Sequence, residues 1–416
     1  MNGAGASSGG RVPVVIYRDH LLRFSEIWVR SQGEALETHL PFYAGSKRRG
    51  DVPMPEERVY TVSNGGLAGR AAEGLFKVAD WAPGLRRWIR EKRPALMHAH
   101  YGVDGALVAP IARALSLPLI VTFHGYEATM RDEFTARSFY LHRKYLRRRQ
   151  RLARQGTLFI AVSDCVRRAL LAQGFPPART VTHYIGVDAS AFTPDPRIGR
   201  ANIVLFVGRF DALKGGAHVV EAMAEVERRV PDASLVVIGD GPEREQLEML
   251  ARRTLRNCRF LGFQPQTEIK TWLNRAKVLC VPSHTIETGE CEAFGLVFLE
   301  AQAMGVPVAS YASGGIPEAV AHGETGLLAP EGDRQSLAAH LAELLTNEPL
   351  WQRMSVAGPL RVRRSFDLKA QARALDGLYR ESVERYRVEK AARMGSYPKE
   401  ATLRDIPFRT PSGRRP

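Results

Sequence analysis

The sequence predicts an α/β protein made of two doubly wound, Rossmann-like domains that face each other across a cleft. Short runs rich in β-branched residues recur without alternation of apolar and polar positions, which is typical of strands covered on both faces. Helical stretches lie between most of these runs, as right-handed βαβ units require. The 416 residues also exceed what a single core usually holds, so about two domains are expected.

The predicted strands form two sets, one in each half of the chain. The first set is VPVVIY (12–17), VYTVS (59–63), ALMHAH (95–100), PLIVTFH (118–124), LFIAVS (158–163) and VTHYI (181–185). The second set is NIVLFVG (202–208), SLVVIGD (234–240), CRFLG (258–262), KVLCVPS (277–283), VPVASYA (306–312) and TGLLAP (325–330). The segment 188–202 separates the sets, since it holds several breakers and little apolar content. Ligands of such sheets bind at the carboxyl ends of the strands, so the cleft between the domains is the expected site.

We expect an N-terminal domain over residues 11–190, a C-terminal domain over residues 191–370 and a helix over residues 371–390. The leader, residues 1–10, and the basic tail, residues 391–416, are polar and are expected to be disordered. The leader lacks the regions of a secretory signal, and no apolar run approaches the roughly 20 residues of a membrane-spanning helix. A cytoplasmic protein is therefore predicted.

The net charge of +15 favours anionic partners, namely nucleic acid, anionic lipid or phosphorylated small molecules. Charge alone does not choose among these partners. No nucleic-acid-binding motif is visible in the sequence, so nucleic acid is not expected as a partner.

The four cysteines, Cys165, Cys258, Cys280 and Cys291, are scattered without C-x-x-C spacing. This pattern argues against metal binding and against disulfide bonds. Inert thiols in a reducing cytoplasm are the expected outcome.

The C-terminal domain opens with the sequence VGRFDALKGG. A strand ends at Gly208, Arg209 and Lys214 follow in the loop, and Gly215 and Gly216 open the next helix. Two cations and a glycine pair at a helix N-terminus suit a phosphate group. The alternative is a solvated loop with two ordinary surface cations. The loop is not a Walker loop, because G-x-x-x-x-G-K-[ST] is absent.

The segment ECEAFGLVFLEAQAMG carries Glu292 and Glu300, eight residues apart, just before and near the second turn of a predicted helix. Within one helix their positions would lie about 12 Å apart along the axis. That spacing excludes the roughly 5–9 Å carboxylate pair of a glycoside hydrolase. It suits contacts at the two ends of a long ligand, with the free N–H groups of Gly295, Leu296 and Val297 between them. The alternative is a glutamate beside a helix N-terminus and a second glutamate in an ion pair.

His124 stands at the carboxyl end of a predicted buried strand, where α/β sheets place their chemistry. A structural histidine with satisfied hydrogen bonds is the alternative. His98 and His100 stand at the end of another predicted strand. No metal site is predicted from the three histidines, because no motif with the ligand spacing of zinc supports it.

Residues 137–154 form a predicted basic helix in which apolar and aromatic residues are interleaved with Lys and Arg. This pattern is typical of a helix that lies on a membrane surface. A helix that packs on the core and exposes a basic face is the alternative.

Together these residues resemble family 4 of the retaining glycosyltransferases, which have the GT-B fold. The resemblance covers roughly residues 95–390 and is most specific over 203–333. There VGRF…KG, IGDGPE, FLGF, VPS…EAFGLVFLEAQA-x-G-x-PV and GGIPEAV-x-x-G-x-TGLL occur in order. The resemblance implies metal-independent hexosyl transfer without a cofactor, a nucleotide-sugar site in the C-terminal domain and an acceptor site in the N-terminal domain. It also implies that the helix over 371–390 crosses back onto the N-terminal domain.

The resemblance further implies roles for single residues. Arg209 and Lys214, beside Gly208, would bind the donor diphosphate, and Glu292 would hold hydroxyls of the donor sugar. Glu300 would bind the ribose hydroxyls and Phe263 would lie by the base. Gly295, Leu296 and Val297 would offer backbone N–H groups to the diphosphate and sugar, and His124 would reach the sugar from the other domain. The implied catalytic residues are Glu292, His124, Arg209 and Lys214.

The first strand departs from the common family pattern, because no Gly-Gly loop follows it. The segment FSEIWVRSQ is similar instead to the S-E-x-F-I-x-x-Q variety of enzymes that build bacterial surface polysaccharides. This similarity favours a polysaccharide or lipid-linked acceptor.

The sequence therefore predicts a retaining glycosyltransferase that moves a sugar from a nucleotide-diphosphate sugar to a glycan or lipid-linked acceptor, in exopolysaccharide or lipopolysaccharide synthesis. The basic surface would dock on the anionic inner face of the cell membrane. One alternative is a nucleotide-sugar epimerase on the same fold, which would isomerise the donor alone. The other is a non-catalytic protein that binds anionic membranes and has no affinity for nucleotide sugars.

Overall fold

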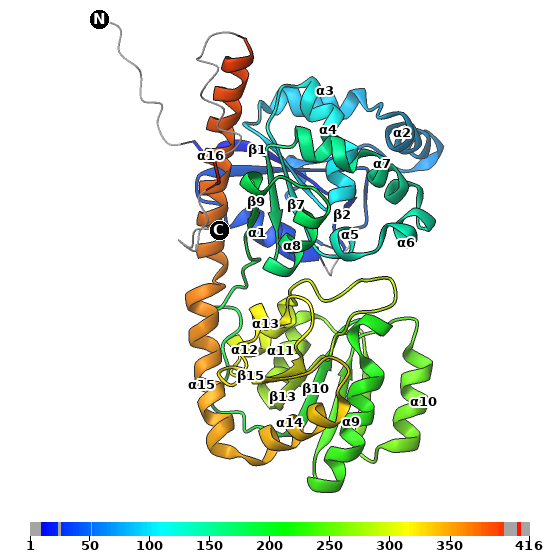
Figure 1. Cartoon of the computed structure of the whole chain (residues 1–416), viewed down its shortest axis with the longest axis vertical. Coiled ribbons are helices and arrows are strands. Elements are labelled where there is room, and N and C mark those ends of the chain that lie inside the picture. The colour runs from blue at the N-terminus through cyan, green and yellow to red at the C-terminus, as the bar shows by residue number, and fades with distance from the viewer. Residues whose placement is uncertain (1–9, 24–25, 51, 395–405, 409–416) are drawn as a thin grey trace, which may run out of the picture.

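The computed structural model describes residues 10–23, 26–50, 52–394 and 406–408 (Figure 1). The predicted leader lies outside the described residues except for Gly10. Two parallel sheets, each covered by helices, stand one above the other and form two α/β domains. This is the predicted fold class.

The N-terminal domain contains a seven-stranded parallel sheet of order β5-β3-β1-β6-β7-β8-β9. Its strands are β1 (Val12–Tyr17), β3 (His39–Gly45), β5 (Val59–Thr61), β6 (Met97–His100), β7 (Leu119–Phe123), β8 (Leu158–Ala161) and β9 (Thr180–Thr182), with the short pair β2 (His20–Leu21) and β4 (Lys47–Arg48) beside it. Its helices are α1 (Ile27–Glu34), α2 (Gly66–Ala79), α3 (Pro83–Lys92), α4 (Gly102–Ala114), α5 (Tyr126–Thr129), α6 (Asp132–Arg137), α7 (Tyr140–Gln155) and α8 (Asp164–Ala172).

The C-terminal domain contains a six-stranded parallel sheet of order β12-β11-β10-β13-β14-β15. Its strands are β10 (Ala201–Val207), β11 (Ser234–Ile238), β12 (Cys258–Gly262), β13 (Ala276–Cys280), β14 (Val308–Tyr311) and β15 (Gly326–Ala329). Its helices are α9 (Gly216–Arg229), α10 (Arg244–Thr254), α11 (Gln266–Arg275), α12 (Leu296–Ala303), α13 (Ile316–Ala319), α14 (Arg334–Thr346) and α15 (Glu348–Ser365).

Strand β3 is the one long strand that the sequence did not predict. Pro41 in its middle argues against a central strand, since proline cannot donate to a ladder. Pro41 lies opposite Val14 of β1, whereas the neighbour on the other side, β5, pairs with β3 only from Tyr43 onward. Pro41 therefore faces no strand on that side, and its missing N–H breaks no ladder.

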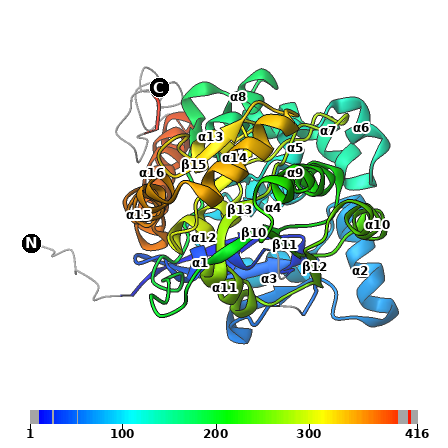
Figure 2. The same ribbon diagram turned by 90° about the horizontal axis from the view of Figure 1, so that it is seen from below.

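The last helix, α16 (Leu368–Arg393), runs from the C-terminal domain along the flank of the N-terminal domain, as both views show (Figures 1 and 2). The carboxylate of Asp376 accepts hydrogen bonds from the backbone N–H groups of Glu37 (2.8 Å) and Thr38 (3.0 Å) and shares one with His39 Nδ1 (2.6 Å). The Tyr379 hydroxyl shares a 2.7 Å hydrogen bond with His98 Nδ1. These bonds hold α16 against the first sheet.

The prediction of a disordered tail over 391–416 is wrong for part of that range. Residues 391–393 still belong to α16, and Phe408 is buried in a cluster with Leu375, Leu378 and Tyr379. The Arg385 guanidinium lies 3.9 Å from the centre of the Phe408 ring. Residues 395–405 and 409–416 lie outside the described residues.

Candidate active site

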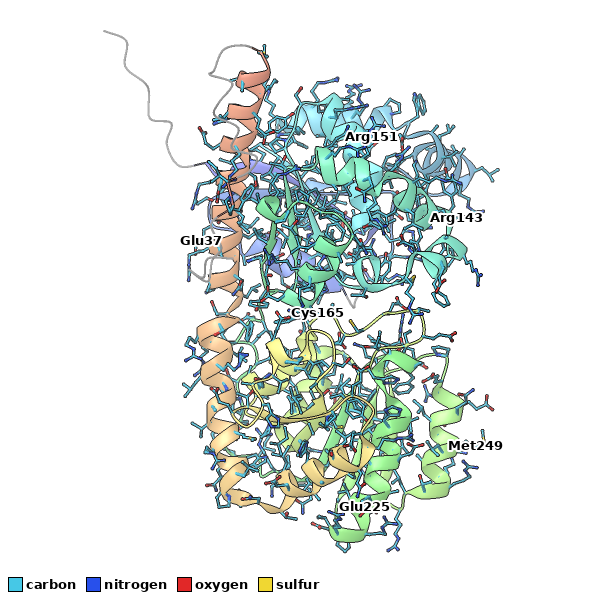
Figure 3. All side chains as sticks on the ribbon, viewed as in Figure 1. Glu37, Arg143, Arg151, Cys165, Glu225 and Met249 are labelled. Atoms are coloured by element: carbon cyan, nitrogen blue, oxygen red, sulfur yellow. The ribbon has the colours of Figure 1, made fainter. Side chains whose placement is uncertain are left out.

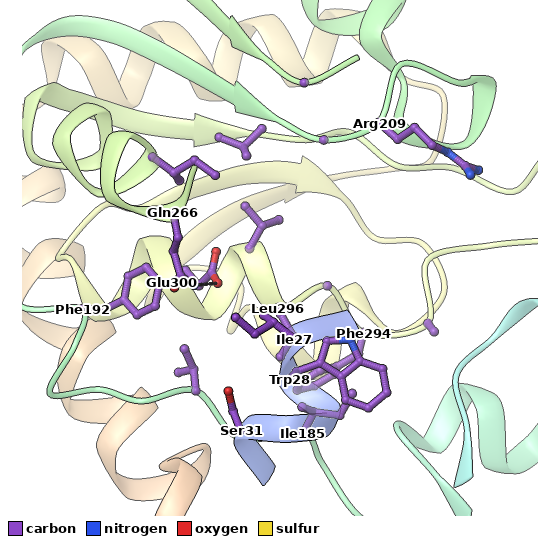
Figure 4. A pocket seen from close by; sticks show the side chains of 18 of the residues that line it. Ile27, Trp28, Ser31, Ile185, Phe192, Arg209, Gln266, Phe294, Leu296 and Glu300 are labelled. Carbon is purple, nitrogen blue, oxygen red and sulfur yellow. Dashed lines mark hydrogen bonds between the residues drawn. The ribbon is translucent and has the colours of Figure 1, made fainter. Parts of the chain in front are cut away.

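A pocket of about 730 Å³ lies between the two domains, a volume typical of small-molecule sites. It is formed where strands of both sheets end, as expected for paired α/β domains. The predicted site residues all line it: Gly208, Arg209, Lys214, Phe263, Glu292, Gly295, Leu296, Val297, Glu300 and, from the other domain, His124. Figure 4 shows part of this lining, with Arg209 distant from the apolar group around Trp28 and Phe294.

The loop after β10 is shaped by Asp211. The Asp211 carboxylate accepts a 3.2 Å hydrogen bond from the backbone N–H of Lys214 and also pairs with the Arg209 guanidinium. The Arg209 side chain remains 74% exposed, so its charge faces the open end of the pocket. The loop therefore presents cations where a strand ends and a helix begins, which suits an anionic group.

Lys214 and Glu292 form an ion pair, with Nζ and Oε2 2.5 Å apart. The Ser283 hydroxyl donates a 3.0 Å hydrogen bond to the same carboxylate oxygen, and Glu292 is buried. The sequence suggested separate ligand groups for the two residues but not their contact. The pair shows that the places expected for diphosphate and sugar adjoin each other.

Helix α12 begins at Leu296, so Glu292 lies in the preceding loop, just before the helix as predicted. Gly295 precedes the helix with φ +85°. A Cβ atom there would lie 2.4 Å from the Phe298 ring. Both the positive φ and this close approach therefore require glycine. The first-turn N–H groups of a helix have no partner within the helix and can bind an anion.

Glu300 lies in the second turn of α12, at the end of the pocket opposite Arg209 (Figure 4). Gln266 at the start of α11 donates a 3.3 Å hydrogen bond from Nε2 to Glu300 Oε1. Burial raises the pKa of Glu300 to about 7 despite this bond. Sequence reasoning missed Gln266, because nothing in its local pattern marks it as a partner of Glu300.

His124 is held by aromatic neighbours on the N-terminal side of the cleft. Its Nε2 shares a 3.1 Å hydrogen bond with His100 Nδ1, and its ring lies 4.4 Å from the Trp28 ring and 4.6 Å from the Tyr101 ring. Burial lowers the pKa of His124 well below its usual range. The histidine is therefore neutral at physiological pH.

His98 is a structural histidine rather than a ligand group. Its Nδ1 bonds to the Tyr379 hydroxyl and its Nε2 to the Thr122 hydroxyl, each at 2.7 Å. Burial lowers its pKa to about 3. Across the described part of the chain, no three His, Cys, Asp or Glu side chains converge as they would around a metal ion.

The segment after β1 takes a form that the sequence left open. Glu26 pairs with Arg18 at 2.8 Å, and Arg18 also binds Asp104 at 2.8 Å and lies 4.2 Å above the Tyr101 ring. This buried network fixes the start of α1. Trp28 on α1 consequently lines the cleft, beside Ile27 and Ser31. The FSEIW motif was noted in the sequence, but the position of Trp28 was not inferred from it.

Helix α7 packs part of its apolar side on the core, whereas Phe139 and Tyr140 at its start are exposed. Tyr145 and Leu152 are buried in the core, and Lys144 is paired with Asp80 at 2.6 Å. The alternative, a helix that packs on the core and exposes a basic face, describes it; Figure 3 marks Arg143 and Arg151 on this domain. None of the helices in the described residues combines the length and apolar character that a membrane crossing requires.

Comparisons with solved structures show the class of protein. The chain matches sucrose-phosphate synthase from Thermosynechococcus elongatus with a TM-score of 0.72 at 24% identity, over 89% of this chain and 99% of that one. It matches Anabaena HepE, crystallised with UDP and glucose, with a TM-score of 0.71 at 19% identity, over 89% of this chain and 100% of that one. The two domains therefore have the GT-B fold.

Family models and relatives identify the family. The model for glycosyl transferases group 1 matches residues 191–361, and the model for glycosyltransferase family 4 matches residues 47–191. WcaL of Salmonella typhimurium, named as a colanic acid biosynthesis glycosyltransferase, is 31% identical over 76% of this chain and 82% of its own. A GDP-mannose-dependent phosphatidylinositol monomannoside mannosyltransferase of Mycobacterium tuberculosis is 33% identical over 66% of this chain and 72% of its own. The chain belongs to this glycosyltransferase family, and neither the epimerase nor the non-catalytic alternative is favoured.

Proposed function

We propose that the chain is a retaining hexosyltransferase that uses a nucleotide-diphosphate sugar and a glycan or lipid-linked acceptor, in exopolysaccharide or glycolipid synthesis. The supporting observation is the contact of Lys214 with Glu292 in a cleft that also contains Glu300 and His124. The glutamates that would bind hydroxyl groups thus lie in the same cleft as the cationic loop that would bind the diphosphate. Relatives named for colanic acid and phosphatidylinositol mannoside synthesis support an acceptor of this kind.

In the proposed complex the diphosphate lies against Arg209, Lys214 and the N-terminus of α12. Glu292 binds hydroxyls of the donor sugar, and Glu300 binds the ribose near Phe263. The two cations stabilise the negative charge of the leaving nucleotide, which is the main electrostatic demand of the reaction. These cations would fill the place that a divalent metal has in other transferases, so transfer should not depend on one.

Retention is the proposed stereochemical course because neither Glu292 nor His124, the acid-base residues that the family resemblance implies, suits the base that inversion requires. Glu292 contacts Lys214 and so lies on the side of the diphosphate, whereas a base for inversion must act from the opposite face. His124 is nearer to that face but has a strongly lowered pKa, which makes it a weak base. The leaving phosphate would then accept the acceptor proton on the same face.

The direct test incubates the purified chain with a panel of nucleotide sugars and measures the melting temperature, since a bound donor stabilises the fold by mass action. The stabilising donor is then assayed with acceptor in the presence and absence of a chelator, and the anomeric configuration of the product is read by NMR. Donor-dependent transfer with retention and without a metal requirement is expected. An inverted product, or isomerised donor in the absence of acceptor, would contradict the proposal.

We further propose that the N-terminal domain docks on an anionic membrane. Helix α2 exposes Leu67, Leu75 and Val78 beside basic α7, to which it is joined because Lys144 donates to the Lys77 carbonyl at 2.6 Å. Exposed apolar residues flanked by cations suit an anionic lipid surface.

Liposome flotation tests this docking surface: the variant Val78→Glu should weaken binding to anionic liposomes, whereas Met249→Glu on the other domain should not. Equal binding by both variants would refute the docking surface.

A further inference from the structure

Two cysteines from different domains meet at the domain interface. Cys165 lies in the first turn of α8, and Cys291 lies in the loop before α12, yet their thiol groups are near enough for each to shift the pKa of the other. Figure 3 places Cys165 where the N-terminal domain faces the C-terminal one. The sequence alone predicts inert thiols at both positions, because residues so far apart in the chain give no sign of meeting.

The interface around the thiols is held by specific contacts. The Glu318 carboxylate of the C-terminal domain accepts hydrogen bonds from the backbone N–H groups of Asp164 (2.7 Å) and Cys165 (3.0 Å). On the other side, Gly314 lies against the second thiol, since a Cβ added there would be 3.2 Å from Cys291 Sγ. The backbone on both sides is therefore fixed close to the thiol pair.

Cys165 has the features of a reactive thiol. Both Cys165 and Cys291 are partly exposed, so a small reagent can reach them. The neighbouring Cys291 thiol, with help from nearby Arg168, lowers the pKa of Cys165 to about 7. Burial instead raises the pKa of Cys258 to about 12, and Cys280 is fully buried. Thiolate character and access together determine which cysteine reacts.

We propose that Cys165 and Cys291 form a reversible disulfide across the cleft, with a small-molecule disulfide as oxidant. The Cys165 thiolate attacks one sulfur of the oxidant, whose S–S bond breaks and releases one thiolate. Cys291 loses its proton, and its sulfur then attacks the mixed disulfide at Cys165 and releases the second thiolate. The protein dithiol is oxidised by two electrons, and the oxidant disulfide is reduced to two thiols.

The disulfide would couple redox state to the active site. Cys291 is the neighbour of Glu292 in the chain, so the bond ties the glutamate loop to α8 of the other domain. Domains joined in this way cannot separate to exchange nucleotide and product, a motion that limits many enzymes with closing domains. This consequence for activity rests on the proposed transferase function, whereas the disulfide itself does not.

The chemical test treats the reduced, folded full-length chain with oxidised glutathione and maps its peptides without reduction. A Cys165–Cys291 peptide pair, two hydrogens lighter than the reduced pair, is expected, and Cys165→Ser should abolish it. Cys258→Ser is the matched control and should leave the pair unchanged. Separate glutathione adducts on the two cysteines, or a pair that forms only after unfolding, would refute the proposal.

The functional test compares transfer before and after oxidation. The oxidised protein should lose activity and regain it with dithiothreitol, while the Cys165→Ser variant should keep its activity under the oxidant. A mapped disulfide with unchanged transfer would refute the coupling to activity. If the reduced protein transfers no sugar from any donor, the proposed function fails, yet the peptide map still decides whether the disulfide forms.

Discussion

The Lys214–Glu292 pair makes each residue depend on the other. Replacing Lys214 with Ala leaves the Glu292 carboxylate buried with only the Ser283 hydroxyl described as its hydrogen-bond donor. Lys214 is therefore important for the stability of the ligand-free protein as well as for binding of the diphosphate. The two effects can be measured separately.

Lys214→Ala should lower kcat/KM by about 10²–10³-fold, as expected when a group that stabilises developing charge is lost. It should also lower the free energy of unfolding by about 1–3 kcal/mol, because a buried acceptor loses its partner. Steady-state kinetics and urea denaturation measure the two effects. Lys277→Ala is the matched control, since Lys277 pairs with Glu348 at 3.0 Å outside the pocket lining and should leave kcat/KM unchanged.

Glu300 should make donor affinity depend on pH. Its pKa of about 7 leaves it partly protonated near neutrality, and only the carboxylate can accept from both ribose hydroxyls. Donor binding should therefore tighten as pH rises from 6 to 8, and this dependence should vanish in Glu300→Gln. Isothermal titration with the nucleoside diphosphate measures it; a pH-independent dissociation constant in the unmodified chain would contradict the assignment.

The same raised pKa has an effect of opposite direction on stability. The folded state holds the Glu300 proton to higher pH than the unfolded state, so this contribution to stability is present at low pH and is lost as pH rises through about 7. Glu300→Gln carries no such charge. Its melting temperature should exceed that of the unmodified chain at pH 8 and approach it at pH 5.

Trp28 offers a flat apolar surface on the N-terminal side of the cleft. Trp28→Ala should lower transfer by about tenfold through a weaker acceptor contact, because an aromatic contact contributes about 0.5–1.5 kcal/mol beyond the area it buries. Donor affinity should not change, since Trp28 belongs to the opposite domain from Glu300 and Lys214. Trp28→Phe should restore most of the activity. A parallel loss of donor binding would show that Trp28 acts on the donor instead.

At the scale of elements, most strands were predictable because fully buried parallel strands have apolar runs that need no tertiary information. Strand β3 was missed because its proline is tolerated only through the short length of its neighbour β5. Most candidate donor residues could be placed at the cleft from the sequence because they follow a strand or stand near the start of a helix, whereas Glu300 was singled out by its spacing from Glu292. Gln266, Trp28 and the contact of Cys165 with Cys291 were missed because they depend on how distant elements meet.

The stability of α16 on the N-terminal domain centres on Asp376. Burial alone would raise the pKa of this carboxyl, but hydrogen bonds from His39 and from the backbone N–H groups of Thr38 and Glu37 outweigh burial and lower it. A lowered pKa means that the stabilisation is present near neutrality and is lost as pH falls through the folded-state value. The ionised carboxylate of Asp376 therefore helps to hold α16 on the N-terminal domain.

Asp376→Ala should reduce the free energy of unfolding at pH 7 by about 2–4 kcal/mol, since three donors lose their acceptor. The difference from the unmodified chain should shrink in acid, where the carboxyl is protonated in both states. Urea denaturation at several pH values measures this. Glu384→Ala, an exposed position on the same helix, is the control and should have little effect.

At the scale of the whole molecule, the two domains are joined by Glu318 as well as by the chain itself. Because its carboxylate caps the start of α8 across the interface, Glu318→Ala should loosen the domains without unfolding either one. Amide hydrogen exchange of residues 164–167 should become faster, and nearby exposed Glu324→Ala should leave it unchanged. Unchanged exchange in Glu318→Ala would show that the interface does not depend on this carboxylate.

Helix α16 gives the protein an unusual order of completion during synthesis. The cluster that contains Val14 and Leu96 of the first domain also includes Leu375, Tyr379 and Phe408, which are translated after the whole second sheet. The helices that cover the second sheet, β10 to β15, have all been translated by residue 365. Domains usually fold in the order in which they are translated. Here the N-terminal domain is translated first, but its core is completed only after the C-terminal domain. A nascent chain halted before residue 368 would therefore carry a complete second half and a first half whose apolar flank is still open to chaperones.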